Sequence, residues 1–160
     1  MISEMIMVGM ISFIAGLLVH EFVFMKTRKK HLGSMEENYE KVSEFYSVLV
    51  QWIKIHNEGR QLSEYFMRNG YRTIAIYGMK ELGKCLLEEL KNTNIEVLYA
   101  IDQAAENIYA EIDVVKPTDQ LREVDVVVIT AIHYYESIAP KLEEILKCPI
   151  LSIEDVVFEA

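Results

Sequence analysis

Two glycines and an aspartate have the spacing of a phosphate-binding turn. Gly78 and Gly83 are the first and last glycines of a G-x-G-x-x-G pattern, and Asp102 lies 24 positions after Gly78. In this pattern the first glycine permits a tight turn, the last allows close helix packing, and the acid accepts from a ribose hydroxyl. The middle glycine is replaced by Lys80, which would either obstruct a pyrophosphate or hold one of its oxygens. These residues therefore indicate a nucleotide-type ligand.

Further candidates flank this turn. The predicted cofactor-binding residues are Gly78, Met79, Lys80, Leu82, Gly83, Asp102 and Thr130. NAD is the expected cofactor, because Asp102 would repel the 2'-phosphate of NADP. His133 is a weak candidate for acid–base catalysis, and its alternative role is packing at a helix entry. The alternative for the turn is that the glycines serve tight geometry and Asp102 caps a loop, in a domain that binds nothing.

Complete catalytic signatures are absent from the sequence. None of the 9 tyrosines has a lysine four positions later, as sugar epimerases and short-chain dehydrogenases require. There is no HExxH, no GxSxG and no P-loop, since Cys85 stands where a P-loop needs Ser or Thr. Cys85 and Cys148 form no CxxC pair, so neither a disulfide scaffold nor a zinc site is expected. A protein without catalysis of its own is favoured, and no metal is predicted.

The elements that must position these residues alternate between strands and helices. Apolar runs predict strands at 71–77, 95–101, 124–130 and 149–153, with a short extended piece at 112–115, and helices at 81–91 and 134–147. Such alternation predicts an α/β fold with a small doubly wound parallel sheet, Rossmann-like, of about five strands. Ligands of such sheets bind beyond the carboxyl ends of the strands, where the candidate residues fall.

The N-terminal segment is predicted to be a transmembrane anchor. Residues 5–19 carry no charge, and as one helix residues 5–25 would be about 31 Å long, close to the hydrocarbon thickness of a bilayer. A cleaved signal peptide would need its basic residues before the apolar run, whereas Lys26, Arg28, Lys29 and Lys30 follow it. This basic flank places the remaining chain in the cytoplasm, so we expect a single-pass protein of the cell membrane.

A helical linker is predicted between the anchor and the sheet. Gly33 and Ser34 are expected to interrupt the chain, and residues 35–56 then show apolar positions spaced 4, 3, 4, 3, 4, 3. These positions are Met35, Tyr39, Val42, Tyr46, Leu49, Ile53 and His56, with Phe45 and Trp52 widening the apolar face. Docking on the same chain and pairing with a second copy or a partner enzyme both remain open. The expected divisions are an anchor at 1–31, helices at 32–70 and a nucleotide-binding domain at 71–160.

Length and charge exclude other classes. A chain of 160 residues with 51% hydrophobic content is suited to one globular domain. The net charge of −9 divides into +2 over residues 1–34 and −11 over residues 35–160. A body this acidic would repel a phosphate backbone, so nucleic-acid binding is not expected.

Residues 48–159 resemble a known family of bacterial domains. The stretches IYGMKELG, VLYAIDQ, VDVVVITAIHYYESI and CPILSIEDVVFE are similar to the small NAD(P)-binding-like Rossmann domain of surface-polysaccharide gene clusters, often described as sugar-nucleotide epimerase-like. The resemblance implies a role near capsule or exopolysaccharide synthesis. The expected function is a membrane-anchored cytoplasmic nucleotide-binding or regulatory module. The alternatives are an enzyme acting on nucleotide-activated sugars and a ligand-free scaffold that recruits a partner enzyme.

Overall fold

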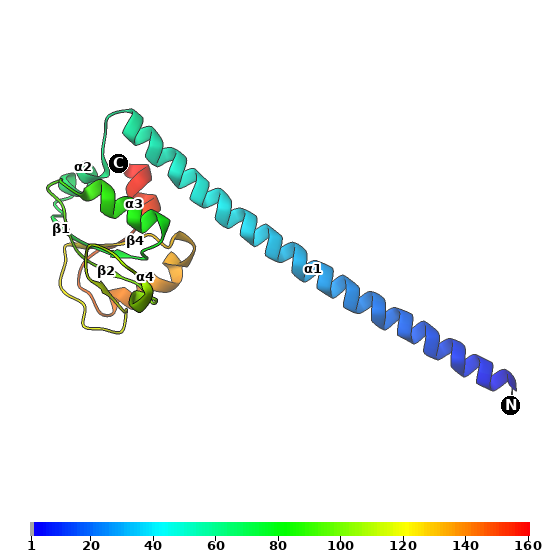
Figure 1. The fold of residues 1–160 in the computed structure, drawn as a ribbon. Coiled ribbons are helices and arrows are strands. Elements are labelled where there is room, and N and C mark those ends of the chain that lie inside the picture. The colour runs from blue at the N-terminus through cyan, green and yellow to red at the C-terminus, as the bar shows by residue number, and fades with distance from the viewer. Residues whose placement is uncertain (1) are drawn as a thin grey trace. The chain divides into compact units, whose positions relative to one another are not determined.

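The computed structural model describes the backbone of residues 2–160 and the side chains of residues 20–21, 24–28 and 32–160. The chain divides into two compact units, Met1–Glu44 and Phe45–Ala160. The long helix α1 (Ile2–Asn57) begins in the first unit and ends in the second. Figure 1 labels several of the elements that follow it in the second unit, which contains the whole sheet.

A five-stranded sheet organises the second unit. Its strands are β1 (Thr73–Tyr77), β2 (Glu96–Ile101), β3 (Val114–Val115), β4 (Val126–Ile129) and β5 (Ile150–Ser152). All neighbouring strands are parallel, and the order across the sheet is β3-β2-β1-β4-β5. The predicted α/β class with a small parallel sheet of about five strands is confirmed. The order reverses beside β1, because β2 and β4 lie on its two sides.

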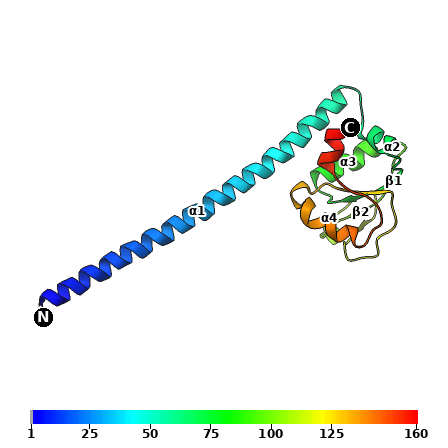
Figure 2. The ribbon, with the colours of Figure 1, turned by 180° about the vertical axis from the view of Figure 1, so that it is seen from behind.

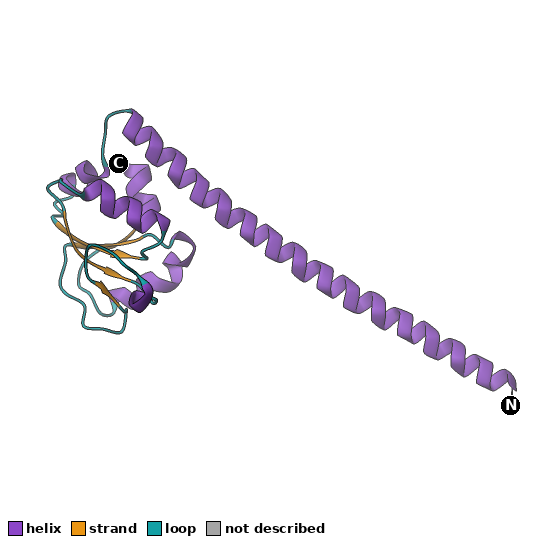
Figure 3. Ribbon diagram, in the orientation of Figure 1, coloured by secondary structure: helices purple, strands orange, loops and turns teal. Residues whose placement is uncertain are grey.

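Helices cover both faces of this sheet, as Figures 1 and 2 show from opposite sides. The helices α2 (Leu62–Arg68), α3 (Glu81–Leu90) and α5 (Ile153–Glu159) pack on one face, and α4 (Tyr135–Glu143) packs on the other (Figure 3). Each face of the sheet has its own hydrophobic core: the first core lies under α2, α3 and α5, and the second lies under α4. Along β1, Ile74 and Ile76 point into the first core, and Ala75 and Tyr77 point into the second. Alternating side chains of a strand point to opposite faces, so a strand covered on both faces needs a continuous apolar run.

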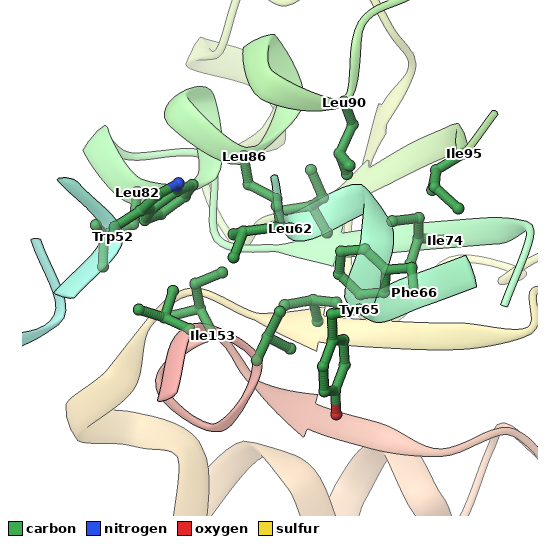
Figure 4. Packing of buried hydrophobic residues seen from close by; sticks show 14 of the residues in the cluster. Trp52, Leu62, Tyr65, Phe66, Ile74, Leu82, Leu86, Leu90, Ile95 and Ile153 are labelled. Atoms are coloured by element: carbon green, nitrogen blue, oxygen red, sulfur yellow. The ribbon is translucent and has the colours of Figure 1, made fainter. Parts of the chain in front are cut away.

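The first core joins distant parts of the chain. Figure 4 shows Trp52 of α1, Leu62 and Phe66 of α2, Leu86 of α3 and Ile153 of α5 converging over the sheet. Each of these side chains is at most 5% exposed, so this layer excludes water almost completely. Burial of this kind contributes roughly 1.5–3 kcal/mol for each large apolar side chain.

A buried carboxylate ties α1 and α2 to α3. The side chain of Glu89 is only 6% exposed. Its Oε2 accepts a hydrogen bond from Trp52 Nε1 and lies 3.2 Å from His56 Nε2. Its Oε1 accepts from the amide of Leu62 at 2.7 Å, at the first residue of α2. Because a buried charge needs hydrogen-bond partners, Glu89 fixes where α1 ends and α2 begins.

Several predicted boundaries differ from the structure. A single helix was predicted at 134–147. The structure has a 3-10 turn at Ile132–Tyr134 and then the helix α4, which ends at Glu143. The helix α5 is not predicted by the sequence, which places Ile153 in the last strand and residues 154–159 in no element; Ser152 begins that helix by accepting from Glu154 N. The predicted interruption at Gly33 and Ser34 is wrong, since α1 continues through both. A single glycine costs a helix only about 1 kcal/mol relative to alanine, and no proline stands nearby.

The linker helix docks on its own unit, but not through the heptad face. Val48, Trp52 and Ile55 are 0%, 5% and 0% exposed and belong to the first core. Of the predicted heptad positions in this unit, Tyr46 and Ile53 are 67% and 58% exposed. The docked face of α1 therefore lies mainly beside the heptad positions, although Leu49, one of those positions, also packs partly against the core.

The transmembrane prediction rests mainly on residues outside this description. Among the described residues, no helix is long and apolar enough to cross a membrane. The predicted anchor at 5–25 includes residues 5–19 and 22–23, whose side chains lie outside the described part of the chain.

Candidate functional site

A cleft of about 770 Å³ opens at the carboxyl edge of the sheet, where the strand order reverses. Its walls come from Phe45 of α1, the turn after β1, the end of β2, the loop after β3, the segment after β4 and one face of α4. Pockets of about 300–1,000 Å³ at such reversal points are the usual ligand sites of parallel α/β sheets. Of the predicted residues, Gly78, Lys80, Leu82, Asp102, Thr130 and His133 line this cleft.

The turn after β1 is built on two glycines in direct contact. Gly78 has φ +96°, a conformation that other residues adopt only with strain, and its amide donates to Ile101 O at 2.8 Å. A Cβ on Gly83 would lie 2.0 Å from Gly78 O, so the first turn of α3 packs against the carbonyl of Gly78. Both glycines therefore have the geometric roles that the pattern predicts. Gly83 is buried behind the turn and is not part of the cleft wall.

The two residues between these glycines point in opposite directions. Met79 is 2% exposed and belongs to the first core, so its side chain does not line the cleft. Lys80 is exposed, lines the cleft and precedes the first residue of α3. The ammonium group of Lys80 and the amide groups at the start of α3 thus belong to the same end of the cleft. The lysine and the helix N-terminus favour negative charge there, and the carboxylates of Glu81 and Asp102, which also line the cleft, oppose it.

Asp102 braces the turn. Its Oδ2 accepts from Met79 N at 2.9 Å, and its Oδ1 accepts from Ala104 N at 2.9 Å. The carboxylate therefore links the end of β2 to the turn after β1, in addition to lining the cleft. Each carboxylate oxygen has a second lone pair, so Asp102 retains capacity to accept from a ligand hydroxyl.

Thr130 holds the same turn from the other side. Its side chain is almost fully buried, with Oγ1 2.5 Å from Gly78 O and 3.1 Å from Tyr77 O. Its amide also donates to Tyr77 O at 2.9 Å. The hydroxyl proton is thus used within the protein, and Thr130 shapes the cleft floor rather than presenting a free donor to a ligand.

One face of α4 and its 3-10 entry forms a wall that the sequence analysis did not include. Tyr134 of the 3-10 turn, Ser137, Ile138 and Lys141 of α4, and Ile145 just after α4 line the cleft. Tyr134 and Ile145 are 57% and 58% exposed, so large apolar surface is open to the cleft. The mixed apolar and polar spacing along residues 134–145 was the signal that could have identified this wall.

Two lysines and two carboxylates line the cleft. Lys80 comes from the β1–α3 turn and Lys141 from α4, while the acids Glu81 and Asp102 belong to α3 and the end of β2. Because the second unit as a whole is strongly acidic, two lysines in one cleft are a local departure from its charge. Among the described residues, no group of three or more His, Cys, Asp or Glu is placed to hold a metal ion.

Acid–base groups at the cleft are few. His133 is exposed and lines the cleft within the 3-10 turn after β4. The neighbouring Tyr135 turns toward the sheet, where its hydroxyl donates to Ile150 O at 3.0 Å. Burial, together with the nearby carboxylate of Asp155, raises the pKa of Tyr135 and keeps it neutral. Tyr135 is therefore a packing residue of α4.

The comparison with protein families covers the part of the chain that builds this cleft. The family model described as C2185-like, N-terminal, matches residues 70–149, from the turn before β1 to the residue before β5. The chain belongs to the C2185-like family. No curated protein and no solved structure matches the chain. The resemblance to the polysaccharide-cluster domain therefore stays a prediction, and the function must be argued from the cleft itself.

Proposed function

We propose that this C2185-like protein is a nucleotide-binding module without catalysis of its own, which takes its ligand in the cleft at the carboxyl edge of the sheet. The observation that carries this proposal is the position of the cleft, beside a glycine turn and at the reversal of the strand order. In parallel α/β sheets this is where phosphorylated cofactors bind. A volume of about 770 Å³ is sufficient for a ligand of nucleotide size.

The phosphate end of the ligand is assigned to the turn after β1. Lys80 lines the cleft there, and α3 begins at the next residue with its free amide groups. A Cβ at Gly78 would lie 3.0 Å from Thr130 Oγ1, so a larger residue would crowd the turn against Thr130. Lys80 replaces the glycine that would let a pyrophosphate touch the backbone, so its ammonium group takes over as the phosphate contact.

The opposite wall suits the uncharged part of a nucleotide. Tyr134 and Ile145 expose more than half of their surface, and Ile138 lies between them on the cleft side of α4. Flat rings pack favourably on such aromatic and branched side chains. Asp102 at the end of β2 is available for a sugar hydroxyl through its remaining lone pairs, and its charge favours NAD over NADP.

A second candidate function is an enzyme acting on nucleotide-activated sugars. The observation in its favour is that His133 lines the same cleft, and histidine is the side chain that most often serves as a general acid or base. Against it stands the lack of any tyrosine with a lysine four residues later in the sequence. We therefore place the non-catalytic module first.

The proposed location is the cytoplasmic face of the cell membrane. The uncharged run at 5–19, the length of the segment at 5–25 and the basic residues that follow it support a single anchor. The resemblance to surface-polysaccharide domains supports a regulatory role beside that pathway. After extraction of membranes with alkaline carbonate, the full chain should remain in the pellet. Its release into the supernatant would refute the anchor.

Thermal unfolding of the full chain in a mild detergent tests the ligand proposal. The compounds are NAD(H), NADP(H), coenzyme A and UDP-sugars, each added in excess. A ligand at about 100 times its dissociation constant stabilises by roughly 2.7 kcal/mol, which raises the melting temperature by several degrees. Absence of a shift with every compound would refute a nucleotide site.

The variant Lys80→Glu should remove the shift, and Lys84→Glu is its matched control. Both residues are exposed and belong to the start of α3 or its cap, but only Lys80 lines the cleft. Asp102→Ala is a poorer choice, because it would also release Met79 N and Ala104 N from their acceptor. Turnover of a UDP-sugar that disappears in His133→Ala would favour the enzyme instead.

A further inference from the structure

A stripe of large apolar side chains runs along α1, and all of them except Leu49, which packs partly against the first core, are more than half exposed. The heptad seam is defined here as Leu32, Met35, Tyr39, Val42, Tyr46, Leu49 and Ile53. Leu32, Met35, Tyr39, Val42, Tyr46 and Ile53 are between 58% and 75% exposed. From Leu32 to Ile53 the helix makes about six turns. Single exposed apolar residues are ordinary, but a continuous stripe of this length marks an interaction surface.

The seam is not explained by the docking of α1 on its own unit. That docking uses Val48, Trp52 and Ile55, which are buried. Tyr46 and Ile53 alternate with these residues along the same stretch of helix and remain 67% and 58% exposed. Within residues 45–57, α1 thus has one apolar face that is buried and a second on which Leu49 is partly covered while Tyr46 and Ile53 stay exposed.

The spacing of the seam identifies the kind of partner. Successive members lie 3, 4, 3, 4, 3 and 4 residues apart, which is a repeat of 3.5 residues per turn. A helix that docks on a globular surface follows its own period of 3.6, whereas a sustained period of 3.5 belongs to helices that wind around each other. The a positions are Leu32, Tyr39, Tyr46 and Ile53, and the d positions are Met35, Val42 and Leu49.

The charges along the helix permit that second helix to be a copy of the same chain. The acidic residues Glu37, Glu40 and Glu44 stand at positions that point away from the seam, as does Lys41, which pairs with Glu37 Oε1 at 2.6 Å. Beside the d positions, only Glu36 is charged, followed by Ser43 and Val50. Two strongly acidic chains can therefore approach along this face with little repulsion between like charges.

We propose that two copies of this protein pair through the heptad seam as a parallel two-stranded coiled coil. The pairing rests on α1 alone, while its parallel direction rests on the proposed anchor, because both N-terminal segments would enter the same membrane. The seam ends toward the membrane at Arg28, whose charge takes the next d position. Each dimer then presents two clefts on one membrane face.

Disulfide trapping of the full chain in a mild detergent tests the direction of pairing. Met35 lies near one end of the seam, so Met35→Cys brings two thiols together only in a parallel pair. The matched control is Glu40→Cys, at an exposed position away from the seam. We expect a covalent dimer for Met35→Cys under mild oxidation, and no more dimer for Glu40→Cys than the parent chain gives through Cys85. Equal yields for both variants would overturn the proposal.

The mass of the full chain in detergent tests the pairing itself, apart from the direction. The parent should have twice the chain mass of 18.5 kDa after correction for detergent. The double variant Val42→Glu with Tyr46→Glu should fall to the single-chain mass, and Ser47→Glu on the exposed side of the helix should not. A monomeric parent, or a dimer that survives the double variant, would overturn the seam.

Failure of this proposal is distinguishable from failure of the anchor or the ligand site. The carbonate extraction tests the membrane anchor, and the thermal shift tests ligand binding in the cleft. Neither experiment depends on whether the protein is a dimer. Circular dichroism of the double variant should match the parent, because Val42 and Tyr46 are 67% exposed and belong to neither of the two cores.

Discussion

Replacement of Gly83 by alanine is the most direct test of the turn that forms the cleft. An alanine Cβ at this position would lie 2.0 Å from Gly78 O and 3.2 Å from Thr130 Oγ1. Contacts between such atoms are ordinarily at least 3.4 Å. Since Gly78 O is a backbone atom at the end of β1, the start of α3 or the turn must move by more than about 1 Å to relieve the overlap.

Such a movement is costly because α3 is packed along its inner face. Leu82, Leu86 and Leu90 are 3%, 0% and 2% exposed, and a gap of 0.5–1 Å beside such side chains removes about a quarter to a half of their dispersion energy. Forced overpacking costs about 1–3 kcal/mol, and the lost contacts add to it. Alanine recovers up to about 1 kcal/mol of helix propensity. We expect a net loss of about 2–4 kcal/mol in the free energy of unfolding.

Urea unfolding of the full chain measures this loss through the fluorescence of Trp52, the single tryptophan, which is 5% exposed in the first core. A loss of about 2–4 kcal/mol lowers the melting temperature by roughly 8–16 °C in a unit of the length of Phe45–Ala160. The control is Lys84→Ala on the exposed side of α3, which should stay within about 0.5 kcal/mol of the parent. If Gly83→Ala also stays within that range, the contact between the two glycines is refuted.

Two further substitutions test the hydrogen bonds of buried and exposed carboxylates. Glu89→Ala should cost about 2–4 kcal/mol in urea unfolding, because Leu62 N loses its acceptor, and Glu89→Gln should cost less; equal losses would contradict the role of the acceptor. Asp125 accepts from Arg72 N and Thr73 N at 2.8 Å each, and these bonds lower its pKa. A lowered pKa in the folded state gives stability that is present above the ordinary value of 3.8 and is lost as pH falls through the lowered value. Asp125→Asn should therefore cost about 1 kcal/mol at neutral pH, reduced by its exposure to solvent, and the difference should close below about pH 4. A difference that stays constant down to pH 2 would argue against this carboxylate as the cause.

The architecture of the sheet followed from local patterns. Strands covered on both faces need unbroken apolar runs, so the segments that became β1, β2 and β4 were identifiable without knowledge of their neighbours. The turn at Gly78 was also predictable from the sequence, because a positive φ and a close contact with Thr130 each favour glycine at this position. Lys80, at the middle position of the G-x-G-x-x-G pattern, is exposed in the structure.

Other features depended on contacts between segments far apart in the chain. Asp102 had the spacing of a ribose acceptor, yet its carboxylate is bonded to Met79 N, 23 residues away, and braces the turn. The wall formed by α4 joins the cleft only because β4 lies next to β1. The helix α5 was not predicted, since its seven residues are stabilised by packing on α2 and the sheet rather than by intrinsic propensity.

Helix α1 illustrates the same division most clearly. Its apolar periodicity was evident from the amino-acid order, because residues three and four apart share one side of a helix. Which of its apolar sides would pack on the domain was not, since Val48 and Ile55 are buried through contacts with residues that follow them by many positions. Periodicity specifies that a helix has an apolar face, and long-range packing selects the face that is covered and the face that is left for another chain.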